Sequence, residues 1–138
     1  DGIRPGIYHY LPEDHELELW EDRQDYQEEL ARALGEQPFA AQAPVVFVWS
    51  ALPYRTEWRY GRMASKYILI DAGHVCQSLY MACQSVGLGT CAIGAYNQEE
   101  LDELLGFEPG PSGDKLYECA IYAAPVGKAV SVFPDVSV

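Results

Sequence analysis

Residues 61–96, GRMASKYILIDAGHVCQSLYMACQSVGLGTCAIGAY, determine how this chain folds. Apolar and small side chains recur close to the helical period and also fill many positions between, so the spacing predicts one long helix that is apolar almost all round. About 25 helical residues would span roughly 37 Å, the width of a small domain. Such a helix must be covered on nearly every side, by its own domain or by a second subunit.

Glycines mark the end of this predicted helix. Val86-Gly87-Leu88-Gly89 interrupts the helical pattern, and Gly87 can take the left-handed C′ conformation without a Cβ penalty. Residues 90–93 then have the composition of a short strand. The small residues Gly94 and Ala95 follow, and they leave backbone N–H groups open to close approach by a flat or anionic group.

The remaining segments alternate between strand and helix signals. Before the long helix we expect a β-hairpin of strands 6–10 and 15–20 and then a helix over 25–34, with Asp22 as its N-cap and Gly35 at its end. A strand over 45–49, buried on both faces, should follow. After the long helix we expect a helix over 98–106 capped by Asn97, a Pro/Gly loop over 107–114 and a last strand over 116–126. This order predicts one α+β (or mixed α/β) domain over residues 1–138, with helices packed on a small sheet.

Composition restricts the class of protein. A hydrophobic content of 49% in 138 residues is typical of one globular domain. The net charge of −12 would repel a phosphate backbone, which argues against nucleic-acid binding. Asp71, His74 and Gln77 interrupt the longest apolar run, so we expect no membrane span and a cytoplasmic location. The first residue is Asp1, not Met, so we also expect the natural start to lie further upstream.

The cysteines and histidines do not form a recognisable metal motif. None of the four cysteines forms a Cys-x-x-Cys pair, and the three histidines are scattered, so we expect no metal site. We interpret the four cysteines as ordinary buried thiols in a reducing cytoplasm.

Three segments together resemble one known family. They are RPGIYHYLPEDHELELW at 4–20, APVVFVWSALPYRTEWRYG at 43–61 and KYILIDAGHVCQSLYMACQSVGLGTCAIGAYNQEELDELLGF at 66–107. In this order and spacing they resemble the nitroreductase-like flavoproteins, and within them the SagB-type dehydrogenases, which include azoline oxidases. The resemblance implies an FMN-dependent oxidoreductase of nitroreductase-like α+β fold, a homodimer with flavin at its interface. Its expected reaction is oxidation of thiazoline or oxazoline rings in peptides, with oxygen as the electron acceptor.

The resemblance places the flavin-facing turn at Ile93, Gly94 and Ala95. Flavin is flat and gains negative charge near N1 and N5 on reduction, so small residues with free backbone N–H donors suit it. The alternative is a plain helix-to-strand turn whose glycines serve chain reversal. Lys128, after the last strand, is the expected contact to the flavin phosphate, and its alternative is an exposed lysine near the chain end.

Lys66 and Tyr67 look like the Lys-Tyr pair that azoline oxidases carry close to the flavin. Removing a proton from carbon requires a base, and a lysine desolvated against apolar neighbours can act as one while a tyrosine orients it. The alternative is a lysine that reaches water at the helix start, with Tyr67 in the core. Arg55, Arg59 and Arg62, with Trp58 between them, line a substrate channel or cover the start of the long helix.

One departure from the family pattern leaves the function open. Relatives carry an Arg-rich motif with a serine that holds the FMN phosphate, and no Arg-x-Ser is present here. We therefore expect a fragment whose N-terminal segment is missing, a second polypeptide that supplies it, or weak flavin binding. Two alternatives to azoline oxidation follow: nitro or quinone reduction with NAD(P)H, and a truncated, flavin-free scaffold or partner-binding subunit.

Overall fold

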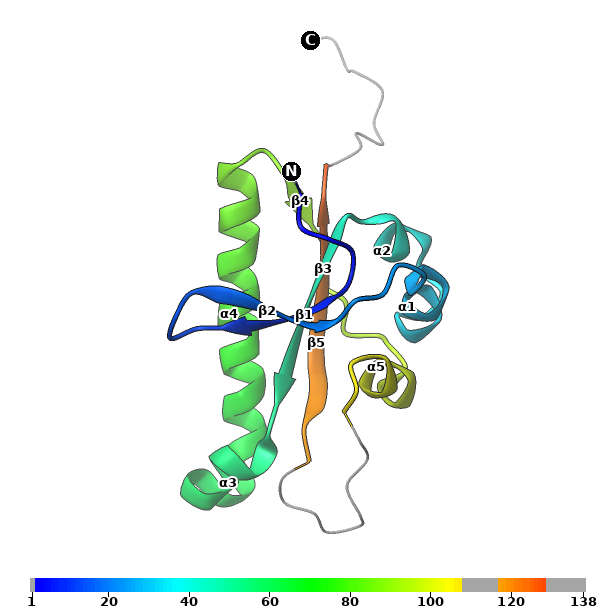
Figure 1. The fold of residues 1–138 in the computed structure, drawn as a ribbon. Coiled ribbons are helices and arrows are strands. Elements are labelled where there is room, and N and C mark those ends of the chain that lie inside the picture. The colour runs from blue at the N-terminus through cyan, green and yellow to red at the C-terminus, as the bar shows by residue number, and fades with distance from the viewer. Residues whose placement is uncertain (1, 108–116, 129–138) are drawn as a thin grey trace.

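A small antiparallel sheet lies between two layers of helices in the computed structural model, which describes residues 2–107 and 117–128 (Figure 1). Its strand order is β3-β5-β4, with β3 at Val45–Ala51, β5 at Cys119–Gly127 and β4 at Gly89–Thr90. The last strand in the chain is therefore central, because it pairs with both of the others. A separate hairpin joins β1 (Ile7–Leu11) to β2 (Glu16–Glu21).

The long helix covers one face of this sheet and three short helices cover the other (Figure 1). The long helix is α4 (Ala64–Ser85); the short ones are α1 (Gln27–Ala33), α2 (Pro38–Gln42) and α5 (Gln98–Leu104). Helix α3 (Pro53–Tyr60) and a 3-10 turn (Gly61–Met63) lead from β3 into α4. The predicted α+β class is confirmed. The sequence patterns did not predict helices α2 and α3.

The main hydrophobic core lies between the sheet and the three short helices. Its fully enclosed members include Ala33, Leu34, Leu101 and Ala123. Alternation along β5 would send Ala120 and Ala123 to opposite faces, yet both are buried in this core. The register shift between Trp49 and Ser50 of β3 explains this, because it leaves an extra residue on β5 between the two alanines.

Helix α4 confirms the predicted long helix, and its C-terminal end takes the predicted form. Gly87 has φ +72°, the Leu88 N–H donates to the Cys83 carbonyl at 2.9 Å, and the Gly87 N–H donates to the Gln84 carbonyl at 3.3 Å. These two bonds are the Schellman arrangement, which satisfies carbonyls that the helix itself leaves unpaired.

The prediction that α4 is covered on nearly every side is not met by its own domain. Four of its residues are buried: Ala64, Ala72, Cys76 and Cys83. Large apolar side chains elsewhere along it are exposed, among them Leu69 at 61% and Met81 at 68%. A single chain therefore leaves a broad apolar surface along this helix.

Two local predictions were wrong. The strand at 45–49 was expected to be buried on both faces, but β3 lies at an edge of the sheet and leaves Val45 50% and Phe47 44% exposed. Asp22 was expected to cap the first helix, but α1 begins after Tyr26 without a side-chain cap. Asp22 instead pairs with Arg4 at 3.5 Å, because the chain between it and α1 is not helical.

The strand predicted over 90–93 is also wrong: β4 covers only Gly89–Thr90, the Ala92 N–H donates to the Tyr80 hydroxyl, and Ile93 forms an isolated bridge to Ala123. The remaining local predictions hold in large part where the structure describes them. The hairpin forms, Gly35 ends α1 with φ +72°, and the Asn97 side chain accepts a hydrogen bond from the Glu100 N–H of α5. The final strand forms but begins at Cys119. Most of the loop predicted over 107–114 lies outside the described residues.

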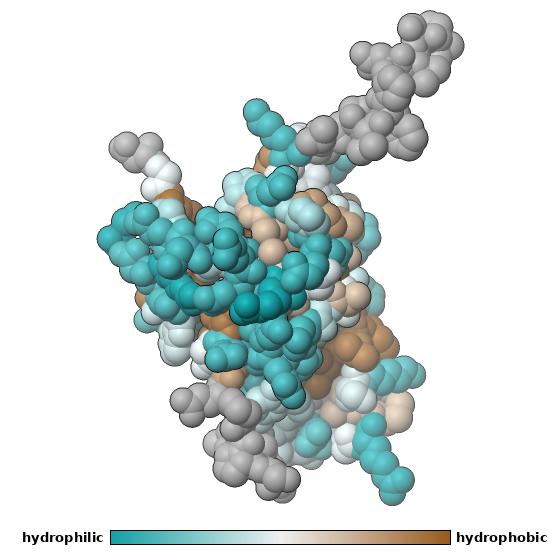
Figure 2. Space-filling view, turned by 90° about the vertical axis from the view of Figure 1, so that its right-hand side faces the viewer, coloured by the Kyte–Doolittle hydropathy of each residue, from teal (hydrophilic) through white to brown (hydrophobic). Residues whose placement is uncertain are grey.

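The face formed by the short helices is mostly hydrophilic, with brown apolar areas toward its margins (Figure 2). Acidic side chains lie in the first turns of α1 and α5, where their negative charge interacts favourably with the positive end of the helix dipole.

None of the helices in residues 2–107 combines the length and the apolar character that crossing a membrane requires.

Candidate functional site

The turn over Ile93–Ala95 splits into a buried half and an open half. Ile93 is 3% exposed, its N–H donates to the Ala123 carbonyl at 2.7 Å, and its carbonyl accepts from the Ala123 N–H at 3.2 Å. This bridge to β5 uses the main-chain groups of Ile93, so they are not available to a ligand. Gly94 and Ala95 are exposed, and the described part of the chain supplies no hydrogen-bond partner for their N–H groups.

The fold does not require a glycine at position 94. Gly94 is not among the residues with positive φ, and a Cβ built on it would lie 3.8 Å from Cε2 of Tyr122, an ordinary contact distance. Chain reversal therefore does not explain the glycine at this position in the single chain. The small side chain leaves room on the open side of the turn.

Two tyrosines that the sequence analysis did not single out hold this turn in place. The Tyr80 hydroxyl of α4 accepts a hydrogen bond from the Ala92 N–H at 2.8 Å, and Tyr122 of β5 lies next to Gly94. Burial is the main cause that raises the pKa of Tyr122, so its ring stays neutral at physiological pH. No local pattern could have revealed these contacts, because their partners are far apart in the sequence.

Lys66 and Tyr67 lie in the first turn of α4, and both are exposed. The Tyr67 ring packs against the Tyr60 ring with centroids 4.5 Å apart and planes tilted by 42°, which joins the end of α3 to the start of α4. Tyr67 is 40% exposed, so the single chain does not place it in the core. Lys66 has no desolvating cover from its own domain.

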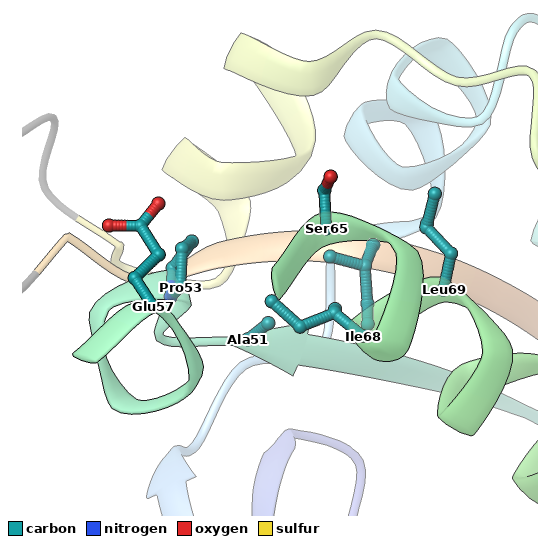
Figure 3. Close-up of a pocket in the computed structure, with 7 residues that line it drawn as sticks. Ala51, Pro53, Glu57, Ser65, Ile68 and Leu69 are labelled. Atoms are coloured by element: carbon teal, nitrogen blue, oxygen red, sulfur yellow. The ribbon is translucent and has the colours of Figure 1, made fainter. Parts of the chain in front are cut away.

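A pocket of about 180 Å³ lies near the start of α4, lined there by Ser65, Ile68 and Leu69; neither Lys66 nor Tyr67 lines it. Figure 3 shows it at the junction of β3, α3 and α4, with the Glu57 and Ser65 oxygens at its margin. Ala51, Pro53, Ile68, Leu69 and Ile121 give it an otherwise apolar lining. An apolar cavity with a few polar groups at its edge suits a small organic ring.

The structure does not bring the two predicted parts of the site together within one chain. Tyr80 reaches Ala92, so the turn runs beside the C-terminal half of α4, whereas Lys66 lies about 14 residues, or roughly 21 Å, earlier along the helix. Among the described residues, no hydrogen bond or ring contact joins Lys66 or Tyr67 to residues 93–95. Lys128 is exposed and follows β5 directly.

The thiols follow the predicted pattern in part. Cys76 and Cys83 are buried, Cys119 is partly buried, and Cys91 is exposed. Burial raises the pKa of the Cys76 and Cys119 thiols, which makes them poor nucleophiles at neutral pH. Within the described ranges, no three His, Cys, Asp or Glu side chains are grouped so that they could hold a metal ion.

Comparison with known proteins identifies the family. The sequence model of the Nitroreductase family matches residues 5–128 of this chain. The chain is also 34% identical over 129 residues to a Methanocaldococcus jannaschii protein provisionally named a nitroreductase. That match covers 94% of this chain and 60% of the relative, so the chain spans about three fifths of the curated relative's length.

Solved structures agree with this assignment. A provisionally named nitroreductase from Anabaena variabilis has a TM-score of 0.80 and 27% identity, over 92% of this chain and 24% of its own. A similarly named protein from Ralstonia eutropha has a TM-score of 0.72 and 26% identity, over 91% of this chain and 54% of its own. The family model over residues 5–128, the curated relative and these two α+β structures agree, and this chain belongs to the nitroreductase family.

A third structure shares the fold at lower identity. A chain of the Escherichia coli microcin synthetase McbBCD complex, solved with a truncated pro-MccB17 bound, has a TM-score of 0.74 and 17% identity, over 89% of this chain and 44% of its own. At this identity the likeness extends to the fold alone.

Proposed function

We propose that this chain is part of an FMN-dependent oxidoreductase, most like the SagB-type dehydrogenases that oxidise thiazoline or oxazoline rings in peptides. One observation carries the cofactor assignment. At Gly94 and Ala95, two consecutive exposed N–H groups are without a partner in the described chain, at a glycine that the fold itself does not need. Such a main-chain edge fits a flat ring that gains negative charge on reduction.

In this proposal the flavin ring lies against Gly94 and Ala95, and Lys128 contacts the phosphate. Bound FMN supplies the hydride acceptor. The residues of this chain handle the other half of the reaction: Lys66 Nζ takes the proton from the ring carbon of the azoline, and the Tyr67 hydroxyl orients it. Loss of one hydride and one proton converts an azoline into an azole, so hydrogen and electrons balance.

A homodimer would complete this site. Lys66 and Tyr67 do not contact residues 93–95 in one chain, and α4 exposes apolar side chains such as Leu69 and Met81 that a second subunit can cover. A partner packed along α4 would also exclude water from Lys66, as a lysine base requires.

The first test concerns cofactor binding. The visible spectrum of the purified protein, with the flavin released by denaturation, shows whether FMN is bound. Replacing Gly94 with Val would put side-chain atoms where the ring should lie, so we expect FMN affinity to fall roughly tenfold or more. The matched control is Gly2→Val near the N-terminus, away from α4, where an added Cβ meets nothing within 4 Å. Unchanged FMN affinity in the Gly94 variant would exclude this turn as the flavin site.

The second test concerns the proton. Lys66→Ala should retain FMN but lose azoline oxidation by about 100-fold or more, the range for removal of a general base. The measurement is turnover of a thiazoline-containing peptide, followed by azole absorbance, in protein of equal flavin content. Arg4→Ala, which removes an exposed arginine paired with Asp22 outside the proposed site, controls for loss of positive charge. Full activity without Lys66 would refute its catalytic assignment.

Nitro or quinone reduction with NAD(P)H is the second candidate. The names of the relatives from Methanocaldococcus jannaschii and Anabaena variabilis favour it. If the protein oxidises NAD(P)H only when a nitroaromatic compound is present and does not turn over an azoline, nitro reduction is favoured over azoline oxidation.

A further inference from the structure

The segment over residues 53–67, here called the basic corner, has a charge opposite to that of the rest of the molecule. It comprises α3, the 3-10 turn and the start of α4. It holds Arg55, Arg59, Arg62 and Lys66 against a single carboxylate, Glu57, whereas the whole chain has nine basic and 21 acidic residues. A positive site on a molecule of net charge −12 is a local feature that needs its own explanation.

Within residues 2–107 and 117–128, the structure shows no ion pair for the cations of the basic corner. The other described arginines are ion-paired: Arg4 with Asp22 at 3.5 Å, Arg32 with Glu100 at 3.0 Å, and Arg23 with two carboxylates. In the part of the chain that the structure describes, the four cations of the corner have no such partner. Their charge is therefore available to a ligand.

Exposed aromatic side chains accompany these cations. Trp58 is 72% exposed and Tyr60 is 42% exposed. Trp58 and Arg62 line an open hollow along α3 together with Tyr54, Glu57 and Gly61. A hollow with an aromatic wall and a guanidinium accepts an apolar or aromatic side chain next to a carboxylate.

The basic corner is continuous with the proposed catalytic pair. The Arg59 guanidinium lies over the Tyr60 ring, 5.4 Å from its centroid, and the Tyr60 ring packs on the Tyr67 ring. Arg62 and Lys66 are four residues apart, so they follow one another along nearly the same side of the chain. A ligand bound at the corner therefore lies close to the Lys66–Tyr67 pair.

We infer that the basic corner binds an acidic stretch of the peptide substrate, with carboxylates paired to Arg55 and Arg62 and an apolar side chain against Trp58. This inference rests on the proposed function, because the substrate is taken to be a peptide. The acidic remainder of the surface repels such a peptide, so the field directs it to this corner. Charge complementarity identifies the occupant, because an acidic peptide finds grouped at this corner four cations that have no ion pair among the described residues.

The test measures peptide binding by fluorescence anisotropy with the full chain. The probe is a fluorescein-labelled nonapeptide that alternates Glu with Leu and Phe, and the neutral probe has Gln in place of Glu. We expect Arg55→Gln/Arg62→Gln to weaken binding of the acidic probe roughly tenfold at low salt. Arg4→Gln/Arg32→Gln loses the same two positive charges elsewhere and should bind like the wild type. Binding to the wild type should also weaken as salt rises.

Four results would overturn the inference: equal loss in both double variants, equal binding of the neutral probe, no salt dependence, or a corner variant that changes only the oligomeric state. The last result would assign the corner to a second copy of the chain. Flavin content is measured in the same samples. Charge-dependent peptide binding without FMN would refute the proposed function and keep the docking site, and the reverse pattern would refute the docking site alone.

Discussion

At the scale of single residues, Asp102 is the clearest case of a side chain whose role depends on distant partners. It is 4% exposed on α5 and accepts hydrogen bonds from the Ala120 N–H at 2.7 Å, the Gln98 side chain at 2.9 Å and the Tyr117 hydroxyl. A buried carboxylate without a cation depends on such donors. These bonds join α5 to the beginning of β5, the central strand.

The Tyr117 hydroxyl provides a pH test of this network. Its hydrogen bond to Asp102 is the largest cause that raises its pKa from 10.0 to about 12. The folded state therefore keeps this proton longer than the unfolded state does, and the free energy of unfolding should fall as pH rises from 10 to 12. Tyr117→Phe should cost about 1 kcal/mol at neutral pH and remove that part of the decline.

Urea unfolding followed by circular dichroism at pH 7, 10 and 12 measures this effect. Tyr10→Phe on the hairpin, which takes no part in the Asp102 network, is the matched control and should follow the wild type. A Tyr117→Phe variant that declines as steeply as the wild type would contradict the assigned role.

At the scale of elements, α4 combines a narrow buried stripe with a broad exposed apolar surface. Its buried residues are small, as in Ala72 and Cys76, so the helix can pack closely on the sheet. Its long apolar side chains lie outside this stripe and are exposed to water in a single chain, and such exposure is unfavourable in free energy. The element therefore has the composition of a helix packed on both sides, although one side lacks cover in the single chain.

A charge on the open side of α4 should prevent self-association. We expect Leu69→Asp to convert a dimer into a monomer, because an unpaired carboxylate would be buried at the interface. Light scattering after size-exclusion chromatography measures the mass directly. Phe39→Asp places the same charge on α2, at an apolar residue that is 46% exposed on the other face of the sheet, and should leave the dimer intact. A monomeric wild type would refute the homodimer.

At the scale of the whole molecule, charge and shape are distributed unevenly. The face of the short helices is mostly hydrophilic (Figure 2), and acidic side chains lie in the first turns of α1 and α5. In contrast, α4 exposes apolar residues such as Leu69 and Met81, and the basic corner holds four cations near the start of that helix. A polar, well-packed face needs no partner, whereas the other features together mark the side where a subunit, cofactor and substrate would bind. The proposals above all concern that side.

Local sequence determined the elements and their ends. Periodicity identified α4, glycines at 35 and 87 ended helices, and Asn97 capped α5, because each signal acts within a few residues of chain. The family resemblance likewise depended on contiguous segments, and the match over residues 5–128 confirms the nitroreductase family. The alternating strands and helices were sufficient to predict the α+β class.

Tertiary structure alone decided which strand is central, which groups of the turn are free and which site residues meet. The apolar run at 45–49 reads as a buried strand, yet it lies at an edge because β5, from the far end of the chain, pairs on its inner side. The Ile93 N–H donates a hydrogen bond to this same strand, whereas the N–H groups of Gly94 and Ala95 have no partner among the described residues. Several segments have a composition that suits a central strand, and pairing between distant strands decides which of them takes that place. Local sequence patterns do not encode this pairing.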